Sequence, residues 1–270
     1  MNLESVDEPI LLTAQDLGKL RLVLSTYQDG TGMLAVSNGR TLPGWRDFER
    51  AVAGVFGGES QESKYVFDVV ISNPDQTGMK YGISCKMRRE LNRVVNGDGR
   101  ITMELSNSSK KFWDYLEKKG LSKTNYKQIP TEIGTSLVEL VNSWHQAESI
   151  AISGKIDLNK SFYLVLSWSK KGQYQLHQFP LMLPDPSTLR WHFPTANRLC
   201  GDDNEGTIFE WYGESGGQLK YYPLAHTAIW SSDIFQLEQL PTEDEIQYGI
   251  LARTQKYFPK QWAEACKSHL

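Results

Sequence analysis

The segments YVFDVVIS (residues 65–72) and YGISCKMR (residues 81–88) decide the fold expected of this chain. Both are rich in Val, Ile, Tyr and Phe, which are typical of strands. Between them, NPDQTG (residues 73–78) has the composition of a turn. A strand over 64–72 and a second strand over 80–87 are therefore expected to pair in sequence order.

Polar side chains interrupt these apolar strands. Because residues two apart share a face of a strand, Ser84 and Lys86 are expected on one face of the second strand. A charged group such as Asp68 inside an apolar strand is costly unless it binds a metal or pairs with a basic side chain. A third strand predicted over 100–106 carries Glu104 on its polar face. Pairing in sequence order would bring all four side chains together.

Such a group suits metal-assisted hydrolysis of a phosphodiester bond. Carboxylates bind Mg²⁺ through oxygen while the ion keeps several waters, and Asp68 and Glu104 are the candidate ligands. The ion lowers the pKa of a bound water and neutralises charge on the phosphate. A lysine such as Lys86 can orient that water or stabilise the pentavalent phosphorus. Glu49, in a helix predicted over 43–57, could approach from the side.

Two helices are predicted near the N-terminus. The first runs from Thr13 to Gln28, with Asp16 placed to complete a capping box. The second, over 43–57, is amphipathic, and its apolar stripe is expected to face the core. The members of that stripe are Trp45, Phe48, Val52, Val55 and Phe56.

A resemblance to a known family rests on four of these residues: Glu49 in the helix, Asp68 in the first strand, and Ser84 and Lys86 in the second. Together they resemble the PD-(D/E)XK nuclease superfamily, in particular type II restriction endonucleases. The resemblance covers roughly residues 43–120. It implies a mixed central sheet flanked by helices, and a Mg²⁺-dependent enzyme, usually a homodimer, that cleaves double-stranded DNA.

One position departs from the family pattern. Two residues before the lysine the family has Asp or Glu, and this chain has Ser84. Some restriction enzymes of the superfamily carry Ser there and supply the carboxylate from a later element. Glu104 is the first candidate for that carboxylate, and Glu90 and Glu49 are the alternatives.

Charge is unevenly distributed along the 270 residues. The net charge of −3 excludes only a uniformly basic DNA-binding protein. Residues 84–127 contain eleven basic and five acidic side chains, a net of +6, whereas residues 201–245 contain ten acids and one lysine, a net of −9. Because basic side chains neutralise phosphates, residues 84–127 are expected to face DNA.

Candidate DNA contacts come from this basic stretch, from a hairpin predicted over 161–179 and from a loop over 187–198. The candidates are Arg88, Arg89, Lys110 and Lys111 in the stretch, Lys170, Lys171 and Gln173 in the hairpin, and Arg190 and Arg198 in the loop. Side chains of these types can reach phosphates or base edges. The alternative is that the hairpin and loop are ordinary solvent-exposed segments.

The remaining sequence bounds the class of protein. We expect one α/β (α+β) nuclease domain over 1–270, with a catalytic core at about 43–120 and strand-rich DNA-recognition and dimerisation elements at about 121–270. Cys85, Cys200 and Cys266 have no disulfide or zinc spacing. The chain lacks a long apolar run and a secretory signal pattern, so a cytoplasmic protein without a membrane partner is expected.

The function expected from the sequence is that of a homodimeric, type II-like restriction endonuclease, which hydrolyses double-stranded DNA at a short specific site with Mg²⁺. Two alternatives stay open. One is a repair or mobile-element nuclease that recognises DNA structure. The other is a non-catalytic, β-rich binding module that uses the Trp and Tyr residues of 161–230.

Overall fold

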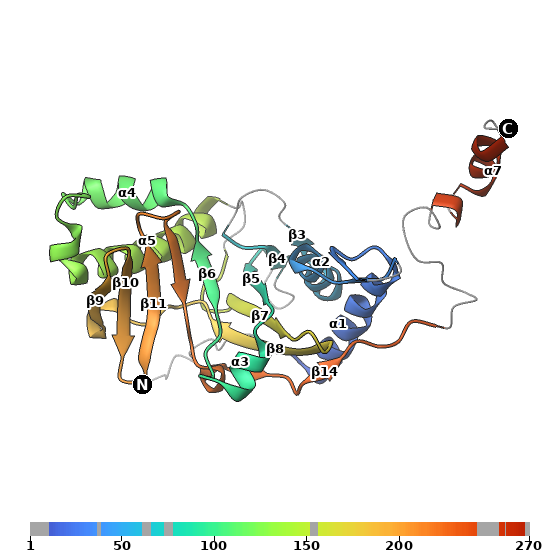
Figure 1. The fold of residues 1–270 in the computed structure, drawn as a ribbon, viewed down its shortest axis with the longest axis horizontal. Helices are drawn as coiled ribbons and strands as arrows, with labels where there is room; N and C mark the ends of the chain where they lie inside the picture. Colours follow the sequence, from blue (N-terminus) through green and yellow to red (C-terminus); the bar gives the residue numbers. More distant parts are fainter. Residues whose placement is uncertain are drawn as a thin grey trace.

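Two large β-sheets organise the fold, and they follow one another along the long axis, the smaller at one end and the larger near the middle (Figure 1). The computed structural model describes residues 11–36, 39–60, 66–72, 78–151, 156–241, 254–256 and 258–267. Within these ranges helices are mixed with several sheets, which confirms the expected mixed α and β class. No helix in the described part of the chain combines the length and the apolar character that a membrane span requires.

The larger, seven-stranded sheet contains the strand pair predicted from the sequence. Its strands, in spatial order, are β13 (Trp230–Ser231), β8 (Gln173–Pro180), β7 (Phe162–Trp168), β5 (Lys80–Arg88), β4 (Val69–Ser72) and β3 (Glu59–Ser60), with β14 (Phe235–Gln236) also paired to β8. β4 and β5 are antiparallel, with Val69 opposite Ile83. On its other edge β5 pairs in parallel with β7. A parallel pair needs a crossover connection, and helix α5 (Pro130–Ala151) lies within it.

The central position of β7 follows from its sequence. Six consecutive residues from Phe162 to Ser167 are buried, and an uninterrupted apolar run is typical of a strand that is covered on both faces. The hairpin predicted between β7 and β8 is confirmed. Its turn places Gly172 at a φ of +71°, a conformation that glycine adopts without steric cost.

The smaller sheet has five strands. In spatial order they are β6 (Met103–Ser106), β12 (Gln218–Tyr221), β11 (Gly206–Tyr212), β10 (Arg198–Asp203) and β9 (Arg190–Thr195). The prediction that the third strand pairs in sequence order is therefore wrong, because Glu104 of β6 lies opposite Lys220 of β12. The edge of β5 that β6 would have used is taken by β7. Each sheet combines strands from before and after residue 120.

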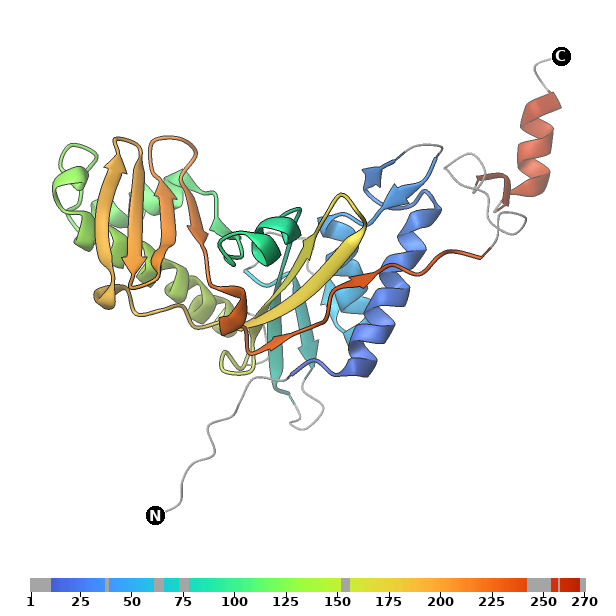
Figure 2. The same cartoon turned by 60° about the horizontal axis from the view of Figure 1, so that its bottom comes forward.

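Helices cover both faces of the larger sheet. α1 (Ala14–Thr26) and α2 (Trp45–Phe56) pack together on one face, as Figure 2 shows. The capping box predicted at Thr13 and Asp16 begins α1. α5 lies on the opposite face, where His145 stacks on Phe67 at 6.0 Å, and extends to β9 and β10 of the smaller sheet. One hydrophobic cluster therefore joins the two sheets.

Short elements complete the fold. They are α3 (Leu91–Asn96), α4 (Ser109–Lys118), which packs on α5, α7 (Pro259–Lys267), and the two-stranded sheet of β1 (Leu34–Ala35) and β2 (Thr41–Leu42). A helix was expected over 243–267, interrupted at Pro259. Residues 242–253 lie outside the described ranges, and α7 begins at Pro259. Proline is favoured at the first turn of a helix because its missing N–H group needs no partner there.

Candidate active site

Asp68 lies at a bend immediately before β4, and not inside a strand as predicted. Its backbone N–H group donates to the carbonyl of Ile83 at 3.0 Å, and its Oδ2 accepts the backbone N–H of Cys85 at 2.7 Å. The carboxylate thus takes the place of a backbone acceptor at the end of the β4–β5 ladder. The preceding residue, Phe67, packs where a Cβ on Gly82 would lie, at 2.3 Å from its ring atoms. This contact fixes the bend.

Ser84 and Lys86 meet Asp68, as the sequence predicts. Lys86 Nζ donates to Ser84 Oγ at 2.7 Å and lies 3.5 Å from Asp68 Oδ2. Ser84 Oγ in turn lies 3.4 Å from the same carboxylate oxygen. Only about a fifth to a quarter of the Lys86 and Asp68 side chains is exposed. Ser84 therefore holds the lysine against the acid.

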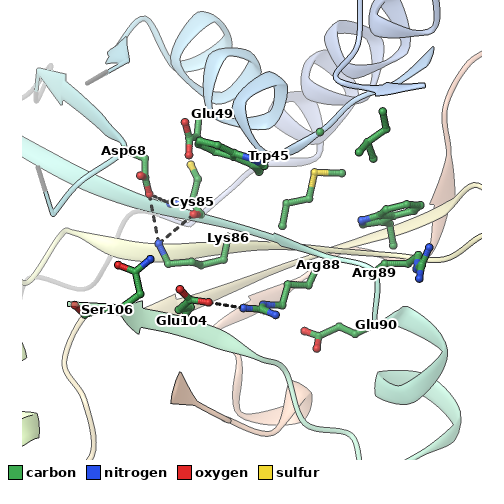
Figure 3. Close-up of a pocket in the computed structure, with 15 residues that line it drawn as sticks. Trp45, Glu49, Asp68, Cys85, Lys86, Arg88, Arg89, Glu90, Glu104 and Ser106 are labelled. Carbon is green, nitrogen blue, oxygen red and sulfur yellow. Dashed lines mark hydrogen bonds and ion pairs between the residues drawn. The ribbon is translucent and has the colours of Figure 1, made fainter. Parts of the chain in front are cut away.

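Glu49 of α2 is the second carboxylate at this point (Figure 3). Burial, followed by the negative charge of Asp68, raises the pKa of Glu49 to about 7, against the opposing charges of Lys86 and two arginines. The start of α2 is fixed by the buried Asp47, whose Oδ2 accepts the N–H groups of Gly44 at 2.8 Å and of Met33 at 2.7 Å. The helix start therefore positions Glu49 two residues further on.

Glu104, the first candidate for the missing carboxylate, has a different partner. Its Oε2 accepts a hydrogen bond from Arg88 of β5 at 2.9 Å. Figure 3 shows Glu104 on the far side of Lys86 from Asp68. Because β6 belongs to the smaller sheet, the Glu104–Arg88 ion pair spans the two sheets.

Glu90, the remaining alternative, is engaged in structural contacts. It accepts the backbone N–H of Thr102 at 2.8 Å and pairs with Arg93 at 2.7 Å. These bonds tie the start of α3 to the segment that leads into β6. Glu49 is consequently the acid that the structure brings beside Asp68.

One open pocket of about 920 Å³ contains this group. Asp68, Glu49, Lys86 and Glu104 line it, and the other residues of its wall are Leu34, Gly44, Trp45, Cys85, Met87, Arg88, Arg89, Glu90, Ser106, Asn107 and Trp168. Trp45 and Trp168 are wall residues that the sequence pattern did not predict. Trp45 was expected in the core but is 50% exposed. The one feature of the sequence that could have indicated this exposure is that Trp45 stands at the N-terminal end of the apolar stripe of α2.

The donor set fits a hard divalent cation with few protein ligands. Every hydrogen bond that Asp68 accepts from the described residues uses Oδ2, which leaves Oδ1 available. Glu49 adds a second carboxylate, and the wall includes Cys85, whose carbonyl lies 3.2 Å from Lys86 Nζ. Across the described ranges, no three His, Cys, Asp or Glu side chains converge on one ion position. Mg²⁺ typically binds one or two carboxylates and keeps its waters.

The predicted DNA contacts are divided among several surfaces. Arg88 and Arg89 line the pocket. Lys110 and Lys111 belong to α4, where Lys110 pairs with Asp114 and Lys111 lies over the ring of Trp144 at 5.5 Å. The +6 stretch therefore does not form one continuous surface towards the pocket.

The later candidates lie outside the pocket wall. Lys170 and Lys171 are exposed in the β7–β8 turn, next to Gln173 at the start of β8. Arg190 pairs with Asp202 at 2.8 Å and Arg198 with Glu210 at 3.0 Å, all four on the smaller sheet. The two arginines are thus already held by acids.

The pocket has four carboxylates on its wall, among them Asp68 beside Glu49, together with a lysine in contact with Asp68 and two arginines. This arrangement can hold a cation, bind a phosphate and orient a water between them. Comparison of the chain with protein-family models, curated proteins and solved structures finds no match.

Proposed function

We propose that this protein is a Mg²⁺-dependent endonuclease that hydrolyses phosphodiester bonds in DNA. More specifically, we propose a homodimeric, type II-like restriction enzyme of the PD-(D/E)XK superfamily that acts on double-stranded DNA at a short site. The observation that carries the proposal is the contact of Lys86 Nζ with Asp68 Oδ2 at 3.5 Å, beside Glu49, in an open pocket.

The two carboxylates supply the metal ligands of the proposed reaction. Asp68 offers Oδ1, and Glu49 is close enough for the Asp68 charge to raise its pKa. Two acids that repel each other in a half-buried site gain most from a divalent cation between them. When bound, Mg²⁺ supplies an activated water and neutralises charge that develops on the phosphate. Glu49 thereby takes the place that the sequence analysis gave to Glu104.

Lys86 positions the attacking water. Its ammonium group donates to Ser84 Oγ and to the carbonyl of Cys85, and these bonds hold it near the acid. A preorganised cation at this point stabilises the developing negative charge without reorganisation during the reaction. Arg88 and Arg89 line the same pocket and neutralise phosphates next to the scissile bond.

Plasmid cleavage tests the proposal. With Mg²⁺ the wild type converts supercoiled DNA to nicked and linear products, and the rate falls by at least about 100-fold in Asp68→Ala and in Lys86→Ala. Asp114→Ala is the matched control, because Asp114 also pairs with a lysine, on α4 outside the pocket, and it cleaves at the wild-type rate. Full cleavage by Asp68→Ala or Lys86→Ala would exclude this site. A fixed fragment pattern on defined plasmids supports the restriction-type form.

A further inference from the structure

Trp45 occupies an unusual place for a large aromatic residue. The next apolar residues of its stripe, Phe48 and Val52, are fully buried, whereas Trp45 is 50% exposed. It lines the pocket together with Asp68 and Lys86 (Figure 3). Packing within the protein therefore accounts for only part of its surface, and the rest belongs to the pocket wall.

The backbone at Trp45 is held by its neighbours. It is the first residue of α2, and the next residue but one, Asp47, is buried and accepts two backbone N–H groups at the helix start. Gly44, directly before it, is packed so closely that an added Cβ would lie 2.7 Å from Met33 Cβ. These contacts fix the backbone from which the half-exposed indole projects.

An arginine guanidinium group lies over the ring of each of the two tryptophans of the pocket. Arg46 Cζ lies 4.8 Å from the centre of the Trp45 ring, and Arg89 Cζ lies 5.9 Å from that of Trp168. Trp168 is backed by Tyr174, with ring centres 6.5 Å apart and planes at 18°. A guanidinium beside an aromatic ring is the combination on which single-stranded nucleic acids are held, with bases on the rings and phosphates near the cations.

We infer that Trp45 is a stacking platform for an unpaired nucleobase next to a phosphate held by Lys86, Arg88 and Arg89 on the same pocket wall. The inference rests on the proposed function and names the state of its substrate. A base inside a duplex is covered on both faces by its neighbours, so it offers no face to an indole. Only a base in a single strand, or one that is already unpaired within a duplex, can stack there.

Binding in EDTA tests the inference without cleavage. The full-length protein is titrated with three DNA probes: a short single strand, the matched duplex, and that duplex with one unpaired base. The variants are Trp45→Ala, Trp45→Phe, and Phe258→Ala as a matched control, since Phe258 is 53% exposed and lies outside the pocket wall. Quenching of tryptophan fluorescence and fluorescence anisotropy of labelled DNA report binding.

Trp45→Ala is expected to weaken binding of the single strand and of the duplex with an unpaired base by about tenfold, because one stacked base is lost. Trp45→Phe keeps most of the affinity, since it keeps an aromatic face. Phe258→Ala binds like the wild type. The affinities of all the variants for the fully paired duplex differ by less than about twofold. Wild-type affinity of Trp45→Ala for the single strand would overturn the inference, and so would an equal loss on the paired duplex.

The outcome is separable from that of the proposed function. If the wild type binds single strands through Trp45 but never cleaves DNA with Mg²⁺, the nuclease proposal fails and the stacking inference stands. If the wild type cleaves DNA and Trp45→Ala binds every probe as tightly, the inference fails and the nuclease proposal stands.

Discussion

The acidic side chains of the two sheets differ in how many hydrogen-bond donors they have and in the direction in which their pKa is shifted. On the smaller sheet Glu210 accepts hydrogen bonds from Arg198, Tyr212 and Tyr222 at 2.7–3.0 Å. Asp202 of the same sheet accepts from Arg190 and His192 and from a threonine. Burial alone would raise the pKa of Asp202, yet these hydrogen bonds lower it below its ordinary value.

At the larger sheet, burial outweighs the groups that would lower the pKa of the acid. Burial and the charge of Asp68 raise the pKa of Glu49 to about 7, although Lys86 lies nearby. Asp68 uses only Oδ2 towards the described residues. An acid with every oxygen satisfied stabilises a fold, whereas two acids with too few donors form a site for an added cation. This contrast between the two pairs of acids is the reason for proposing Asp68 and Glu49, and not Glu210 and Asp202, as metal ligands.

The largest effect is expected for the acid pair itself. Glu49→Gln should lower the rate of Mg²⁺-dependent cleavage by about 100-fold, because it removes a charged ligand while keeping the shape of the side chain. Glu104→Gln, the matched variant, should stay within about threefold, since Glu104 pairs with Arg88. Steady-state cleavage rates at saturating Mg²⁺ measure both. The reverse order of effects would return the ligand role to Glu104.

The next effect concerns the buried histidine behind the larger sheet. Burial, and then the charge of Lys86, lowers the pKa of His145 from 6.5 to about 4. The unfolded chain therefore binds this proton first as the pH falls, and the free energy of unfolding drops from about pH 6.5 downwards, by roughly 3 kcal/mol near pH 4. Above pH 7 the group contributes no pH dependence.

Urea unfolding of the wild type and of His145→Phe from pH 7 to pH 4 measures this effect. The phenyl ring keeps the stack on Phe67 and cannot take up a proton. The stability difference between the two proteins should shift in favour of the variant as the pH falls. A difference that is constant with pH would contradict the prediction.

On the smaller sheet the expected effect is one of stability. Glu210→Gln removes the charge that three donors share, so it should lower the free energy of unfolding by roughly 1–3 kcal/mol. The cleavage rate per folded molecule should be unchanged. Chemical denaturation and cleavage assays on the same samples test both parts. A catalytic loss without a loss of stability would show that the smaller sheet also contains reactive acids.

The smallest effect separates two parts of the basic stretch. Arg89→Ala should weaken DNA binding and reduce the slope of log K against log salt by about one unit, as expected for one lost phosphate contact. Lys110→Ala should change affinity by less than about twofold, because Lys110 is already paired with Asp114 on α4. Anisotropy titrations at several salt concentrations measure both. Equal slopes for the two variants would contradict this division.

The local half of the site could be predicted from the sequence. β4 and β5 are neighbours in the chain, so their pairing and the face shared by Ser84 and Lys86 follow from the two-residue period of a strand. The period also indicated that Asp68 would join them. It did not reveal the bend at Asp68, which depends on Phe67 packing over Gly82.

The contacts between segments far apart in the chain could not be predicted. The alternation of side chains shows which face of a strand a residue lies on, but not which other strand pairs with it. β5 pairs with β7, which follows it by about 80 residues, and this leaves Glu104 on the other sheet. Trp45 shows a similar limit. A helical side chain covers the turn that precedes it, and the first residue of α2 has no such turn, so the indole contributes to the pocket wall instead.

The central claim is that Asp68 and Glu49 hold a divalent cation, and the most direct measurement is Mn²⁺ binding followed by electron paramagnetic resonance. The wild type and Asp202→Asn are expected to bind one Mn²⁺ with equal affinity, and Asp68→Asn to bind it at least about tenfold more weakly. Asp202 provides the control, because its oxygens are already filled by donors of the protein. Equal Mn²⁺ binding by Asp68→Asn and the wild type would contradict the account.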